Sequence, residues 1–257
     1  MKKLADMMPQ IKRLALTYDN YLKSKVEFYN SIPGTLTGYD CKKCLNRGYI
    51  AEIRNDIEVM VKCECMKKRE SLNRLKQSGI ASRIMKKTFT SYRTDEPFQQ
   101  HIKERAAEFV RSHKGKWFFI GGQNGCGKTH ICTAIAGQLL KTGFSVRYML
   151  WAEEAPAAKA AVNEPEYKEI VSGYQKADVL YIDDLFKNSV TDADIRLAFQ
   201  ILDYRYRNSM CTIISSEHTL DEIYSIDKAL GGRIAETAFN INIQKDSKKD
   251  YRLKMKE

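Results

Sequence analysis

The stretch Gly122-Gln123-Asn124-Gly125-Cys126-Gly127-Lys128-Thr129 fits the pattern G-x-x-x-x-G-K-[ST] of a phosphate-binding loop. An apolar segment at residues 117–120 precedes it and a helical pattern at residues 128–141 follows it. Glycines let backbone N–H groups turn towards phosphate oxygens, and the N-terminus of the following helix attracts their negative charge. The sequence therefore predicts an ATP site, with contacts from Gly122, Asn124, Gly125, Cys126, Gly127, Lys128, Thr129 and His130.

Two acidic residues complete the predicted reaction centre. Asp183 and Asp184 follow an apolar segment at residues 179–182. We expect Lys128 to reach the β and γ phosphates, Thr129 and Asp183 to hold Mg²⁺, and Asp184 to orient or activate the attacking water. The alternative for Asp184 is a simple cap at the end of the strand. Because the aspartate side chain is shorter than that of glutamate, the sequence also predicts slow hydrolysis.

Segments with strand and helix character alternate from about residue 98 onward. The predicted strands lie at residues 117–120, 145–150, 179–182, 212–216 and 239–243. The predicted helices lie at residues 128–141, 151–174 and 191–207, with a short one after Thr219. Two helix starts have capping-box spacing, Thr191 with Asp194 and Thr219 with Glu222. The alternation predicts an α/β fold in which helices flank a mainly parallel sheet.

Two further residues are candidates for sensing or completing the site. Ser216 follows the strand at residues 212–216 and could sense the γ-phosphate, with Glu217 as the neighbouring possibility and a polar helix cap as the alternative. Arg233 follows Gly231-Gly232 and could face the nucleotide of a neighbouring subunit; the alternative is an ordinary surface arginine. In the segment Asp203-Tyr204-Arg205-Tyr206-Arg207, Arg205 or Arg207 could contact DNA or another subunit.

A cluster of cysteines lies nearer the N-terminus. Cys41-x-x-Cys44 and Cys63-x-Cys65 together supply four thiolates, which suffice for a closed tetrahedral Zn²⁺ site. The alternative is a set of reduced, unconnected thiols. Residues 49–61 between the pairs predict a hairpin that turns at Asn55-Asp56. This segment is too short and polar to form its own core, so we expect the metal to provide much of its folding energy.

The composition adds weaker constraints. The chain has 257 residues and a formal net charge of +11, which favours association with polyanions such as nucleic acid, although a solvated basic surface is the alternative. No apolar run is long enough for a membrane span, and the N-terminus lacks the features of a signal peptide, so we expect a cytoplasmic protein. We place the boundary between an N-terminal domain of residues 1–85 and an ATP-binding domain of residues 86–257. The basic segment 244–257 could lie near DNA or be a solvated end.

The order of these motifs resembles that of the AAA+ ATPases, and most closely the DnaC/DnaI helicase-loader and IstB-like family. The segments that carry the resemblance are GGQNGCGKTHICTAIA, VLYIDDLF, LDYRYR, TIISSEHTLDEI and LGGRI, and the last two look most like loader-type proteins of phages and mobile elements. The resemblance implies an AAA+ domain without the C-terminal helical lid, since few residues follow position 243. It also implies an N-terminal zinc-binding domain that contacts the helicase.

The leading functional hypothesis is therefore an ATPase that loads a replicative DNA helicase onto single-stranded DNA during replication initiation. The family also implies assembly into rings or spirals, with Arg233 completing a neighbour's site. One alternative is an IstB-like transposition helper, whose partner would be a transposase. Another is a nucleotide-switched DNA-binding adaptor with negligible turnover, which the aspartate at position 184 keeps open.

Overall fold

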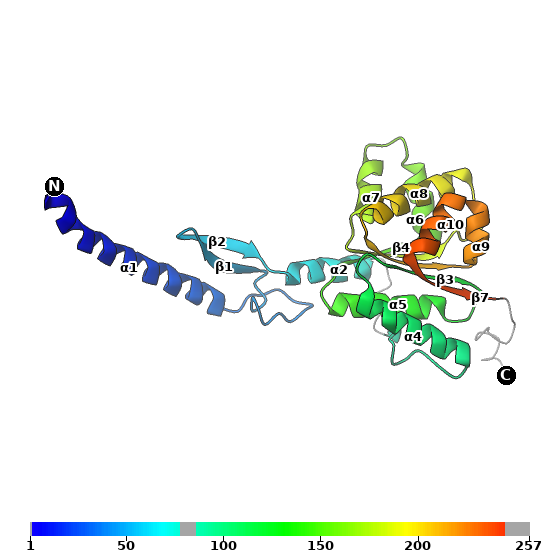
Figure 1. The fold of residues 1–257 in the computed structure, drawn as a ribbon, viewed down its shortest axis with the longest axis horizontal. Coiled ribbons are helices and arrows are strands. Elements are labelled where there is room, and N and C mark those ends of the chain that lie inside the picture. The colour runs from blue at the N-terminus through cyan, green and yellow to red at the C-terminus, as the bar shows by residue number, and fades with distance from the viewer. Residues whose placement is uncertain (1, 78–85, 245–257) are drawn as a thin grey trace. The chain divides into compact units, whose positions relative to one another are not determined.

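The computed structural model describes residues 2–77 and 86–244 (Figure 1). The chain divides into two compact units, Met1–Glu70 and Ser71–Glu257. This division falls inside helix α2 (Cys65–Gln77), earlier in the chain than the expected boundary at residues 85 and 86. The Ser71 side chain explains the difference. Its Oγ donates to Val146 O at 3.0 Å and accepts from Val146 N at 2.6 Å, which joins this part of α2 to the second unit.

The first unit contains a long helix and a hairpin. Its elements are α1 (Lys2–Ser31), β1 (Tyr49–Arg54), β2 (Ile57–Lys62) and the start of α2. The two strands pair antiparallel, and Asn55 and Asp56 both have positive φ angles in the turn between them. These residue types tolerate that conformation, so the hairpin predicted from the sequence is confirmed. The Asn30 side chain joins α1 to β1 through two hydrogen bonds with the backbone of Ala51.

The second unit alternates strands and helices. Its strands are β3 (Trp117–Gly122), β4 (Val146–Leu150), β5 (Val179–Leu185), β6 (Cys211–Ser216) and β7 (Ala238–Ile243). Its helices are α4 (Pro97–Ser112), α5 (Lys128–Lys141), α6 (Trp151–Ala160), α7 (Glu166–Gln175), α8 (Asp192–Arg207), α9 (Leu220–Ile226) and α10 (Lys228–Thr237). The capping boxes at Thr191 and Thr219 form as predicted.

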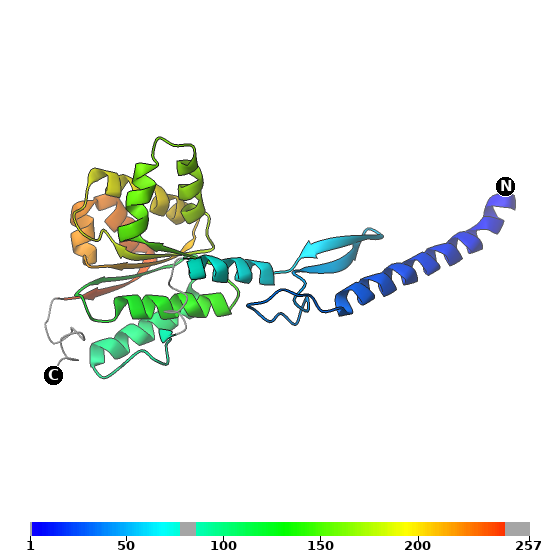
Figure 2. The same cartoon turned by 180° about the vertical axis from the view of Figure 1, so that it is seen from behind.

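The five strands form one parallel sheet in the order β4-β5-β6-β3-β7. Helices α4 and α5 cover one face, and α6 to α10 cover the other (Figures 1 and 2). The side chains of β3 alternate accordingly. Phe118 and Ile120 pack in the core beneath α4 and α5, while Trp117 and Phe119 pack in the core beneath the other helices. A sheet covered on both faces needs strands that are apolar throughout, which explains why β3 is buried at every position. The α/β fold with a parallel sheet flanked by helices is confirmed.

The alanine-rich stretch at residues 155–161 contributes to one of these layers. It forms most of α6, where Ala155 and Ala158 are buried against the sheet. Pro156 lies in the interior of this helix, where its nitrogen cannot donate the usual backbone hydrogen bond, and α7 begins directly after Pro165. Within residues 2–77 and 86–244, the structure contains no helix that combines the length and the apolar character needed to cross a bilayer. The basic segment 245–257 lies outside the described residues.

Candidate functional site

The predicted phosphate loop connects β3 to α5. Gly122 and Gly127 have φ angles of 103° and 95°, and a Cβ on Gly122 would lie 2.0 Å from Ile243 O, so glycine is required there. The ammonium group of Lys128 lies inside the loop and donates to Gly122 O and Gln123 O, both at 2.7 Å. Burial lowers the pKa of Lys128, although nearby acidic groups act in the opposite direction. The loop thus presents a lysine and the N-terminus of α5 to one cavity.

That cavity, of about 220 Å³, has the residues expected around phosphates. Its lining is formed by Lys87, Asn124, Gly125, Gly127, Lys128, Thr129, His130, Asp184, Lys187 and Glu217. The positive groups come from the loop, from the segment before α4 and from the turn after β5. This combination of ammonium groups, helix N-terminus and open volume suits an anionic ligand.

The Asp183 carboxylate is connected to the phosphate cavity through Thr129, one of the residues that line it. It is only 2% exposed and accepts hydrogen bonds from three hydroxyl groups on three different elements. The donors are Thr129 Oγ1 at 3.2 Å, Tyr148 OH at 3.0 Å and Ser215 Oγ at 2.5 Å. The predicted Mg²⁺ pair, Thr129 and Asp183, is therefore brought together at the start of α5. A hydroxyl and a carboxylate are oxygen ligands of the kind that Mg²⁺ uses beside phosphates, so the residues fit this ion.

The end of β5 and the tight turn that follows it carry Asp184 and Lys187 into the cavity. Asp184 and Phe186 have φ angles of 57° and 60°, and the pairing of β5 with β6 shifts register between Ile182 and Leu185. Lys187 forms an ion pair with Glu217 and lies 3.7 Å from Asp184 Oδ2. Sequence reasoning proposed Glu217 only as a second choice and missed Lys187 altogether. No motif contains that lysine; only the αL-tolerant Asn188 beside it (φ 72°) indicated a special turn.

The serines at the end of β6 have different roles. Ser216 is buried, donates to Leu185 O at 2.7 Å and accepts from His218 N at 3.1 Å, and it is not among the residues that line the phosphate cavity. Ser215 instead faces the site: its hydroxyl donates to Asp183 and accepts from Asp184 N at 3.0 Å. Successive residues of a strand point to opposite faces, so only one of the two can contact the aspartates.

A second cavity, of about 310 Å³, adjoins the phosphate cavity. It shares Gly125, Gly127 and His130 with the phosphate cavity and is completed by Ser91, Tyr92, Arg93, Gln99 and Cys126. The His130 ring meets the Tyr92 ring edge to face at 5.2 Å, and its Nε2 lies 3.2 Å from Thr88 O. Burial lowers the pKa of His130, while the Thr88 carbonyl acts in the opposite direction. The larger cavity has space and aromatic lining for a nucleobase, and Tyr92 is a lining residue that sequence reasoning missed.

Arg233 lies on α10 and is held against α8. Its Nε and Nη2 donate to Asp203 Oδ1 at 3.0 and 2.6 Å, and its guanidinium lies over the rings of Phe199 and Tyr206. Arg233 is not among the residues that line the two cavities of its own chain. Its side chain is 24% exposed, so part of it reaches the surface of the unit.

The structure corrects the expectation for Arg205. This side chain is fully buried and donates to the carbonyl groups of Tyr174, Gln175, Ala177 and Cys211 and to Thr212 Oγ1. Its role is to satisfy backbone carbonyls between α7 and the sheet, so it cannot contact DNA or another subunit. Arg207, two residues further along α8, is 73% exposed and pairs with Asp203. The two arginines differ because a helix turns by about 200° over two residues.

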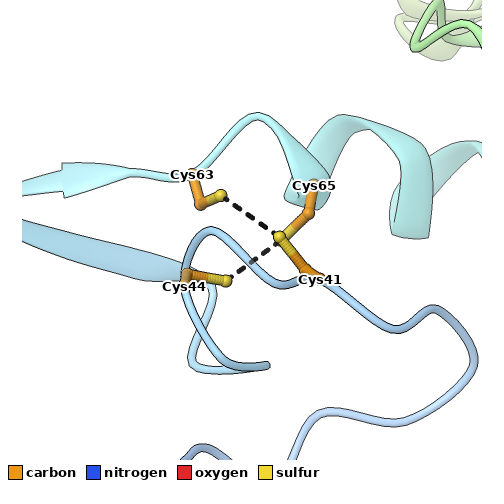
Figure 3. Close-up of side chains that lie close together, drawn as sticks. All are labelled: Cys41, Cys44, Cys63 and Cys65. Carbon is orange, nitrogen blue, oxygen red and sulfur yellow. Dashed lines mark hydrogen bonds between the residues drawn. The ribbon is translucent and has the colours of Figure 1, made fainter. Parts of the chain in front are cut away.

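The four cysteines of the first unit converge on one point (Figure 3). Cys41 and Cys44 come from the loop before β1, Cys63 follows β2 and Cys65 begins α2. All four sulfur atoms are buried and lie within 4.8 Å of one another, with 3.8 Å between Cys41 and Cys63 and 3.5 Å between Cys44 and Cys65. A tetrahedral Zn²⁺ with Zn–S bonds of about 2.3 Å places its sulfur ligands about 3.8 Å apart. The arrangement therefore fits zinc.

The surroundings of the sulfurs also favour a metal. Gly48 N donates to Cys44 Sγ at 3.3 Å, and Asn46 Oδ1 accepts from Cys41 N at 2.9 Å, which fixes the first knuckle. Burial raises the pKa of Cys65 to about 12, whereas at Cys44 the effect of burial is outweighed by the Gly48 N–H and the neighbouring thiols, giving about 7. Keeping all four cysteines as thiolates at neutral pH therefore requires a cation among them, and binding of the metal would release protons.

We expect freshly purified, reduced protein to contain one zinc ion per chain and the Cys63→Ser variant to lose it. The first unit should then unfold at lower temperature, because the cysteines form its buried centre. Metal analysis and circular dichroism during heating would measure both effects. Cys211→Ser, which changes a buried thiol of the second unit, is the control and should retain zinc. Substoichiometric zinc in the unmodified protein would contradict the site.

Comparison with known proteins finds similarity to ATP-binding proteins. The family model described as IstB-like ATP binding protein matches residues 52–257. The chain is 32% identical over 212 residues to the phage-like element PBSX protein XkdC of Bacillus subtilis (strain 168), which covers 77% of this chain and 79% of that protein. It is 25% identical over 193 residues to the replicative helicase loader DnaI of the same organism, which covers 73% of this chain and 61% of DnaI.

A solved structure shares the fold. The crystal structure of the DnaC helicase loader superposes with a TM-score of 0.54 at 22% sequence identity, covering 64% of this chain and 99% of that one. The parallel sheet flanked by helices is thus the fold of AAA+ loader domains. Because the family model spans most of the sequence, including the phosphate loop and both aspartates, the chain belongs to the family of IstB-like ATP binding proteins.

Proposed function

We propose that this protein is an ATPase that loads a replicative DNA helicase onto single-stranded DNA during replication initiation. The observation that carries the proposal is the cavity lined by Lys128, Thr129 and Asp184, with the Asp183 carboxylate hydrogen-bonded to Thr129. Relatives named as replicative helicase loaders support the choice of partner. The four-cysteine unit supports it as well, since it provides a separate module that can hold a protein partner while the second unit binds nucleotide.

The nucleotide would lie across the two cavities. Lys128 would exchange its loop carbonyls for the β and γ phosphates, and the larger cavity beside Tyr92 would take the base. Thr129 and Asp183 would hold Mg²⁺, which neutralises charge on the phosphate oxygens. Asp184, fixed by the hydrogen bond from its N–H to Ser215, would orient the attacking water. Its short side chain makes slow turnover, stimulated by DNA or a partner, the expected behaviour.

Replacing Asp184 by asparagine should lower single-turnover ATP hydrolysis by about 10²–10⁴-fold, the usual contribution of a positioned general base. ATP binding should remain, because Lys128 and the loop are unchanged. Quenched-flow measurement of phosphate release and fluorescent-nucleotide titration would separate the two effects. Asp221→Asn, an exposed change on α9, is the control. A variant that hydrolyses ATP at the unmodified rate would remove Asp184 from catalysis, and negligible turnover by the unmodified protein would favour the nucleotide-switched adaptor.

Arg233 would act between subunits of a ring or spiral, where it would face the phosphates of a neighbour. Asp203 then serves to position its guanidinium at the surface of α10. This assignment predicts that Arg233→Ala and Lys128→Ala proteins are each inactive alone but regain ATPase activity when mixed. A site with an intact loop from the first variant and Arg233 from the second would then be complete.

The control mixture combines Lys128→Ala with Asp184→Asn protein. Both changes affect the part of the site that each chain supplies to its own nucleotide, so this mixture should stay inactive. Failure of the first mixture to regain activity, or full activity of Arg233→Ala alone, would show that Arg233 is a structural surface residue.

The loader function itself predicts a complex with the replicative helicase of the same host. Gel filtration should show co-elution that depends on ATP, and single-stranded DNA should change the stability of the complex. Lys128→Ala should abolish the ATP dependence, whereas Lys141→Ala, a change of an exposed lysine at the end of α5, should not. Absence of a complex under every condition would contradict the loader function. Co-elution with a transposase instead would favour the transposition helper.

A further inference from the structure

Two carboxylates, those of Asp184 and Glu217, line the phosphate cavity. A triphosphate is itself strongly negative, so a carboxylate near its terminal phosphate repels it unless a cation lies between them. Lys187 supplies a cation at this place: its ammonium group pairs with Glu217 and lies 3.7 Å from Asp184 Oδ2. The position of the Lys187 ammonium therefore decides the local charge that a terminal phosphate meets.

The backbone that carries Lys187 is firmly held. Lys187 N donates to Asp184 O at 3.0 Å, and the buried Phe186 ring packs edge to face on Trp151 at 5.6 Å. Ser216 donates to Leu185 O from the end of β6. The Lys187 side chain is less constrained, since it is 32% exposed. A fixed Cα with a long, partly exposed side chain allows the ammonium to exchange partners without any change in the fold.

Lys128, which also lines the cavity, shows a similar arrangement. Its ammonium group is held by oxygen atoms, here the loop carbonyls of Gly122 and Gln123. Phosphate oxygens carry full negative charge and accept stronger hydrogen bonds than carbonyl groups do. Both lysines thus have oxygen partners that a phosphate can replace, but only Lys187 is held by the carboxylates of Asp184 and Glu217. Asp184 is also the residue expected to orient the attacking water.

We propose that the Lys187 ammonium group binds the terminal phosphate of ATP, and that it pairs with Glu217 when this phosphate is absent. The proposal rests on the proposed function in taking ATP as the ligand of the cavity. Lys187 then makes the site respond to the γ-phosphate, because ADP has no group to draw the ammonium away from Glu217. Its move to the phosphate also takes it away from Asp184, which leaves that carboxylate available for water only when ATP is bound.

The test compares the binding of the β,γ-methylene analogue of ATP with that of ADP by calorimetry. Lys187→Met should weaken the analogue about 10- to 100-fold, the loss expected for a charge-assisted hydrogen bond, with little change for ADP. Glu217→Gln should strengthen binding of the analogue relative to ADP, since it releases Lys187 and removes a negative charge. The double variant should bind the analogue more weakly than Glu217→Gln alone, by about the same factor as in the single lysine variant.

Each contrary result has a distinct meaning. If the double variant binds the analogue as tightly as Glu217→Gln, Lys187 only neutralises Glu217 and the proposal is overturned. It is also overturned if Lys187→Met leaves the ratio of the two affinities unchanged while the unmodified protein binds both nucleotides. An unmodified protein that binds neither nucleotide overturns the proposed function itself. Lys168→Met, a change of an exposed lysine on α7, is the control, and Lys187→Gln repeats the test should the methionine variant fold poorly.

Discussion

The buried carboxylate of Asp183 is the interaction on which the nucleotide-binding unit depends. A charged group that is 2% exposed is strongly unfavourable unless hydrogen bonds replace its water. Here the replacements are hydroxyl groups from α5, β4 and β6, so the carboxylate links three elements around its own strand, β5. The same bonds bring Thr129 beside Asp183 and fix the loop against the sheet. One group therefore connects the packing of the sheet to the place where a metal and phosphates would bind.

The turn after Asp183 places further charged side chains close to this buried carboxylate. Positive φ angles at Asp184 and Phe186 reverse the chain so tightly that Phe186 enters the core while Asp184 and Lys187 face the cavity. The end of β6 stabilises the turn from the side, with Ser215 bonded to Asp184 N and Ser216 bonded to Leu185 O. The positions of Asp184 and Lys187 in the cavity thus depend on a backbone turn that two neighbouring serines stabilise, one through a backbone N–H group and the other through a backbone carbonyl.

The two units are stabilised by different physical means. The second unit has extensive apolar cores on both faces of its sheet. In the first unit, the buried cluster consists of the four cysteines, with Tyr39, Ile50 and Met66 packed against them. Arg69 adds hydrogen bonds to Tyr39 O and Asn46 Oδ1. A cluster of this size gives little hydrophobic stabilisation, which is why we expect metal ligation to contribute much of the folding energy there.

The sequence alone determined the features that depend on local spacing. The phosphate loop, the strand that carries Asp183, the Asn55-Asp56 hairpin and the paired cysteines could each be predicted, because each follows from residue types at fixed separations along the chain. Only the tertiary structure decided which of Ser215 and Ser216 faces the aspartates, since a shift of one residue reverses the direction of a strand side chain. The burial of Arg205 among carbonyl groups from distant segments, and the position of Lys187 beside Glu217, were likewise visible only in the tertiary structure. Contacts of this kind depend on how the strands assemble, which local spacing does not encode.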